Sequence, residues 1–190
     1  PNNPISETKN VGGGYIKGGA NYNINEKSNV FFNTGYISRQ PQFGAVFPGY
    51  ANNINPDLQN ETITSFEAGY GYISNTLRFN VNVYSTVWGN RFIQRSLSNQ
   101  NGNDGFAQFK DIDVVHNGFE LEGSWSPVGS STKVRGMLSI GDWKYTKNFE
   151  AAIFDDNQAQ IGTATLYTKD AKVGDAAQFT ANLGVDHRIG

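Results

Sequence analysis

The chain of 190 residues contains no cysteine and only two histidines. Without cysteine it has no disulfides, no thiolate zinc site and no thiol nucleophile. Charged residues make up only 17% of the sequence and the formal net charge is −2, so the basic surface typical of nucleic-acid binding is missing. No run approaches 18 apolar residues, which excludes a transmembrane helix. These absences exclude thiol-based catalysis and thiolate zinc sites, and they argue against nucleic-acid binding.

Glycine and aromatic residues are plentiful instead. The chain has 22 glycines, and phenylalanine, tryptophan and tyrosine together make up 13% of it. Asparagine, serine and threonine supply the polarity that lysine and glutamate supply in most proteins. This composition favours turns and strands with one apolar and one neutral polar face, and it disfavours helices. The length suits one domain.

Short and long connections alternate along about seven strand-like segments. The short links are 25–28, 73–75 and 127–131, and the long links are 40–62, 95–105 and 146–175. A meander with its tight turns at one end and its long loops at the other is the plan of an outer-membrane β-barrel. The spacing therefore predicts an all-β fold, an antiparallel up-and-down meander that forms a partial transmembrane β-barrel of about seven strands.

Side-chain alternation within the segments predicts two different faces. In 77–84, for example, leucine, phenylalanine and valine alternate with arginine and asparagine, and in six segments the apolar row carries no charge. Only 29–39 is ambiguous, because Phe31 and Phe32 fall on opposite faces. The polar row is expected to face the lumen of the barrel, with Glu67, Arg78, Asn80, Asn82, Glu120 and Glu122 as its members.

A soluble β-sandwich also keeps one face of each strand away from water. It is therefore the alternative to a membrane barrel that comes from a different class of protein. Three details favour the membrane. Tyr22, Tyr72 and Trp125 lie close to short turns, where an interfacial aromatic girdle would lie. The apolar rows contain glycine and alanine as freely as leucine, and the segments reach about ten residues. If the chain were a sandwich, Phe43, Phe47 and Tyr50 could serve as the platform of a secreted carbohydrate-binding module.

Candidate ligand-binding residues lie in and near the first long loop. Phe43, Phe47 and Tyr50 stand among glycine and proline, and Arg39 and Arg91 at strand ends on that side could attract an anionic ligand. We identify no catalytic constellation, no metal site and no cofactor site. The oxygen-rich segments 99–104 and 155–157 lack the ordered spacing of a calcium loop, although calcium binding there stays open.

Several short motifs in order resemble TonB-dependent outer-membrane receptors, especially those of Bacteroidota. These motifs are SRQPQF at 38–43, NPDL at 55–58 with Glu61, FEAGY at 66–70, NVNVY at 80–84 with Trp88 and Arg91, and GFELE at 118–122. The resemblance spans about residues 12–188. Barrels of this family have 22 strands, so it implies that residues 1–190 are a fragment of a single β-barrel domain, from its C-terminal half, with the plug domain and other strands elsewhere.

The resemblance also implies a function. It implies an importer in the bacterial outer membrane that is not an enzyme, with membrane lipid around it and the TonB complex acting through parts outside this chain. Its extracellular ligand would be a scarce nutrient such as a siderophore, cobalamin, a peptide or a glycan. A passive porin-like barrel is a further alternative, because no motif in these residues indicates contact with the TonB complex that supplies energy.

Overall fold

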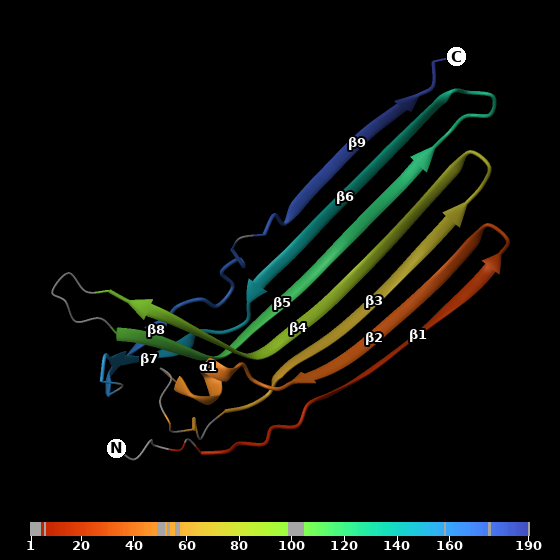
Figure 1. Ribbon diagram of the computed structural model, residues 1–190. Coiled ribbons are helices and arrows are strands. Elements are labelled where there is room, and N and C mark those ends of the chain that lie inside the picture. The colour runs from red at the N-terminus through yellow and green to blue at the C-terminus, as the bar shows by residue number, and fades with distance from the viewer. Residues whose placement is uncertain are drawn as a thin grey trace.

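The computed structural model describes residues 5, 7–48, 52, 54–55, 58–98, 105–157, 159–174 and 176–189. Nearly all of them lie in or beside antiparallel strands (Figure 1). The elements are β1 (Gly14–Asn25), β2 (Ser28–Arg39), α1 (Phe43–Val46), β3 (Glu61–Ile73), β4 (Leu77–Leu97), β5 (Gly105–Trp125), β6 (Thr132–Tyr145), β7 (Phe149–Asp155), β8 (Gln160–Leu166) and β9 (Phe179–His187). In the described ranges, no helix has both the length and the apolar character needed to cross a bilayer.

The strands pair in the order β1-β2-β3-β4-β5-β6-β9, which confirms the predicted antiparallel meander of seven strands. The tight turns lie at one end of the sheet, and α1, β7 and β8 lie at the other (Figure 1). One prediction needs correction, because the link at 146–175 contains the β7–β8 hairpin. β7 pairs with residues 105–109 of β5, a part of β5 that extends beyond its pairing with β6. The hairpin therefore satisfies backbone groups that an open loop would leave unpaired.

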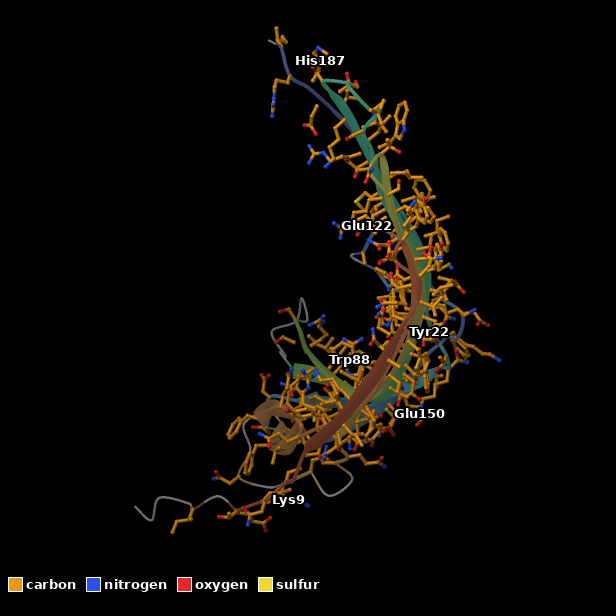
Figure 2. The ribbon with its side chains drawn as sticks, turned by 90° about the vertical axis from the view of Figure 1, so that its right-hand side faces the viewer. Lys9, Tyr22, Trp88, Glu122, Glu150 and His187 are labelled. Carbon is orange, nitrogen blue, oxygen red and sulfur yellow. The ribbon has the colours of Figure 1, made fainter. Side chains whose placement is uncertain are left out.

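The sheet is a single curved layer with two chemically different faces. Seen edge-on in Figure 2, it forms an arc with Glu122 and Trp88 on the concave side and Tyr22 on the convex side. Large apolar side chains on the convex side are open to the surroundings; Val83 is 53% and Leu183 77% exposed. No second sheet covers this face in the described part of the chain. A lipid-facing surface must be left uncovered in this way. In a β-sandwich, by contrast, a second sheet packs on the apolar face.

The ambiguous segment 29–39 resolves within this sheet. Phe32 lies on the convex face, where its ring centroid is 6.5 Å from that of Phe66. Phe31 lies on the other face against Gly69, where an added Cβ would come within 2.4 Å of the Phe31 ring. The glycine thus makes room for an aromatic ring on the polar face. One phenylalanine therefore belongs to each surface.

The small core of the described chain lies at the loop end of the sheet. Its buried apolar residues are Ala45, Ala107, Ile112, Val114 and Ala151. They come from α1, β5 and β7, and α1 packs against β4. Elsewhere the sheet has apolar and polar surface but little interior, as expected for the wall of a barrel. The loop end is consequently the best-packed part of the structure.

Candidate functional site

A hydrogen-bonded row of amides and carboxylates crosses the concave face. The Asn33 side-chain amide donates to Glu67 Oε2 over 3.1 Å, and the Asn82 amide donates to Glu67 Oε1 over 2.8 Å. Asn82 Nδ2 also lies 3.4 Å from Glu120 Oε2. The row spans β2 to β5, because the antiparallel register places these positions side by side. It forms a polar, ion-attracting band at mid-height of the sheet.

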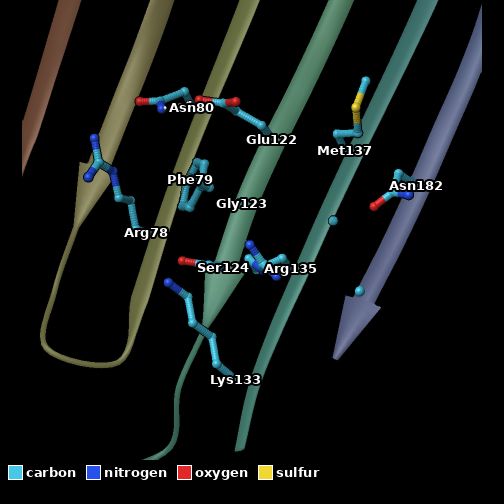
Figure 3. A pocket seen from close by; sticks show the side chains of 12 residues that line it. Arg78, Phe79, Asn80, Glu122, Gly123, Ser124, Lys133, Arg135, Met137 and Asn182 are labelled. Carbon is cyan, nitrogen blue, oxygen red and sulfur yellow. Dashed lines mark hydrogen bonds between the residues drawn. The ribbon is translucent and has the colours of Figure 1, made fainter. Parts of the chain in front are cut away.

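A second depression lies on the same face near the tight turns. The Asn80 amide donates to Glu122 Oε1 over 2.9 Å, and beside them three cationic side chains surround a hollow of about 440 Å³ (Figure 3). These side chains are Arg78, Lys133 and Arg135, of which Arg135 pairs with Asp186 at 2.9 Å. The concave face is therefore acidic at mid-height and basic toward the turns.

The candidate residues Arg39 and Arg91 both contact the ring of one tryptophan at the loop end. The Arg91 guanidinium carbon lies 4.3 Å from the Trp88 ring centroid, and the Arg39 carbon lies 5.5 Å from it. Arg39 also forms an ion pair with Glu61, whose side chain is only 5% exposed. Because the Glu61 carboxylate neutralises the Arg39 guanidinium, the contact of Arg39 mainly stabilises the structure. Arg91 forms no ion pair with any described residue.

The loop aromatics are partly placed. Phe43 is 64% exposed, and its ring centroid lies 5.0 Å from that of Phe47. Tyr50 lies outside the described residues. Buried Asn55 holds α1 in place: its backbone N–H donates to the Val46 carbonyl over 2.9 Å, while its side chain accepts a bond from Lys110 over 3.2 Å. The Phe43–Phe47 pair is thus displayed on an anchored turn.

Two left-handed residues bend the long β4–β5 hairpin. Asn90 has a φ of 56° and Asp111 one of 53°, and the strand register shifts between Trp88 and Ile93. The Asp113 carboxylate accepts the Asn90 backbone N–H at 2.9 Å and pairs with Lys147 at 2.7 Å. Such bulges redirect strands at functional rims. Here they carry the loop end of β4, residues 91–97, alongside α1 on the concave side (Figure 2).

The weaker chemical candidates lie apart. His116 packs edge-on against Trp143, whereas His187 bonds Thr132 at 2.8 Å. The Asp155 carboxylate accepts the Ala159 N–H and so closes the β7–β8 turn. The segment 99–104 is outside the described residues, and the remainder contains no group of three or more metal-binding side chains.

The sequence alone did not predict that Glu61 pairs with Arg39 or that Asn55 bonds Lys110. It also did not predict that both arginines contact the ring of Trp88. Glu61, Asn55 and Trp88 all occur in motifs quoted for the family resemblance, so the motifs marked the right positions. The Arg39–Glu61 and Asn55–Lys110 contacts join residues 22 and 55 positions apart, and no local periodicity reveals such partners.

Comparison with known proteins identifies the family. A family model described as "TonB dependent receptor-like, beta-barrel" matches residues 6–190. No curated protein and no solved structure matches the chain. The family comprises receptors and transporters of the outer membrane, in agreement with the open antiparallel sheet and its exposed apolar face. The chain therefore belongs to the TonB-dependent receptor-like β-barrel family and is part of an outer-membrane transporter.

Proposed function

We propose that this chain forms part of the wall of an energised importer for a scarce nutrient. The observation that carries the proposal is the division of one sheet into an exposed apolar face and a hydrogen-bonded polar face. Acyl chains would cover the first, and an aqueous or plugged lumen would adjoin the second. The nutrient would be a siderophore, cobalamin, a peptide or a glycan.

The open edges of the sheet support the proposal that residues 1–190 are one piece of a single barrel domain. In the described residues, β1 pairs only with β2, and β9 only with β6. An exposed edge would pair indiscriminately unless further strands completed the circle. The plug and the segment that contacts the TonB complex would belong to those other parts of the receptor.

The loop end supports ligand capture on the extracellular side. Tight turns of outer-membrane barrels face the periplasm and long connections face outward. On this orientation, Phe43, Phe47 and Arg91 lie at the outer opening, while the polar band with Glu67 and Glu120 lies deeper in the lumen. The ligand would meet the aromatic and cationic groups first and the carboxylates and amides afterwards.

Uptake measurements test the proposal. The receptor encoded by the complete gene would be expressed in a host lacking its own high-affinity receptors, in matched strains with and without TonB. Four labelled probes would be offered: a ferric siderophore, cyanocobalamin, a tetrapeptide and maltohexaose. Accumulation of one probe only in the strain with TonB is the expected result. Equal accumulation in both strains would instead indicate a passive porin, and no accumulation of any probe would contradict import of these nutrients.

A further inference from the structure

We propose that a groove between α1 and the loop end of β4 binds an organic anion that carries carboxylate or phosphate groups. The groove has a volume of about 540 Å³ and is lined by Gln42, Gly44, Ala45 and residues 91–96. A volume of this size accommodates a small organic molecule. This inference names the ligand class for the proposed importer and rests on that function.

The charge of the groove points to an anion. Arg91 and Arg95 both line it, and among the residues that the structure describes none of those lining it is acidic. Neither arginine forms an ion pair with a described residue. Both belong to the end of β4 and line the same groove, although the strand register shifts between Arg91 and Ile93. Two guanidinium groups with no carboxylate between them attract anions and repel cations.

The structure also holds Arg91 ready for a ligand. Its guanidinium carbon lies 4.3 Å from the Trp88 ring centroid, and this cation–π contact holds the charged group beside the ring. Arg39, on the same ring, is already engaged by buried Glu61. Glu61 is therefore occupied and does not compete for Arg91. The structure in this way assigns the binding charge to Arg91 and Arg95 and gives Arg39 a supporting role.

The remaining lining fits the uncharged part of such a ligand. Gln42, Gln94 and Ser96 offer neutral hydrogen-bonding groups, and Phe92 and Ile93 add apolar surface. Planar guanidinium groups match the two oxygens of a carboxylate or a phosphate in a paired hydrogen bond. A neutral sugar would leave both charges unmatched in the groove, so we expect it to bind far more weakly.

Calorimetric titration of the complete receptor in detergent tests the inference with citrate and glucose 6-phosphate as anionic probes and glucose as the neutral match. We expect at least one anion to bind and glucose not to bind. Charge-assisted hydrogen bonds of this kind change affinity by about tenfold to one hundredfold each. Arg91→Gln and Arg95→Gln should each weaken the anion accordingly. Arg188→Gln, which removes the same charge from an exposed side chain just after β9, should leave binding unchanged.

Three results would overturn the inference: neither anion binds, glucose binds as well as glucose 6-phosphate, or the Arg188 variant loses as much affinity as the Arg91 variant. Circular dichroism and heat-modifiability of each variant would establish that it is folded. Uptake in the strains with and without TonB keeps the two proposals distinguishable. A receptor that accumulates a neutral nutrient in a TonB-dependent manner would refute the anion groove and leave the importer intact.

Discussion

Two neighbouring residues of β4 allow the membrane orientation of the sheet to be tested directly. Val83 lies on the convex face opposite Ala68 and Phe119, and it is 53% exposed. Asn82 lies on the concave face and donates to Glu67 and Glu120. The same substitution to arginine at both positions adds the same charge and similar bulk. Only the medium that the side chain meets differs.

The expected difference is large. An arginine on the lipid face near mid-depth costs roughly 2–4 kcal/mol of barrel stability, since lipid offers it no counter-ion. That free energy corresponds to a change of about 30-fold to 700-fold in the ratio of folded to unfolded protein. An arginine at position 82 would lie between the carboxylates of Glu67 and Glu120, where a partly exposed ion pair contributes about 0–1 kcal/mol. The receptor with Val83→Arg should therefore fail to fold under conditions in which the receptor with Asn82→Arg still folds.

The complete receptor would be refolded into phosphatidylcholine vesicles, and the folded fraction measured by heat-modifiability on gels over a urea titration. Val83→Leu serves as the control that changes shape without charge. Abundance in the outer-membrane fraction of cells gives a second, independent readout. Equal folding of Val83→Arg and Asn82→Arg would refute the assignment of the convex face to lipid.

Three further predictions concern the loop end. Gly105→Ala should loosen the β7–β8 hairpin toward proteases, because the new Cβ would lie 2.3 Å from a backbone carbonyl of β7; Gly162→Ala, with open space around it, is the control and should show no change. Asn90→Val should cost about 1–2 kcal/mol in a urea titration because its φ is positive, whereas Asn90→Gly should be tolerated; equal losses would contradict the strained bend. Arg39→Met should lower the thermal midpoint by leaving the Glu61 carboxylate buried and unpaired, at a cost of about 1–3 kcal/mol, and Glu61→Gln added to it should recover stability; no recovery would count against the ion pair.

Much of the fold was predictable because strand periodicity is local. Asn80, Asn82 and Glu122 alternate with apolar neighbours, and period two alone places them on one face. The tight turns at 25–28, 73–75 and 127–131 were predicted as the short links between segments of alternating residues. The β7–β8 hairpin was not predicted, because its two strands have only seven residues each and the partner of β7 lies some 45 residues earlier in β5. Short strands without an obvious neighbour resemble loops in sequence.

The candidate site was predictable only in part. Phe43, Phe47 and Arg91 stand out in the sequence as aromatic and charged residues near turns, yet nothing local shows that Arg39 is taken by Glu61 or that Arg95 shares a groove with Arg91. By itself, the sequence determined the seven strands of the meander, the two faces of six of them and the family, since side-chain alternation and short motifs are properties of consecutive residues. The tertiary structure alone decided which charges are neutralised and which remain open to a ligand, because strand register, curvature and the bend in β4 bring together groups that are distant along the chain.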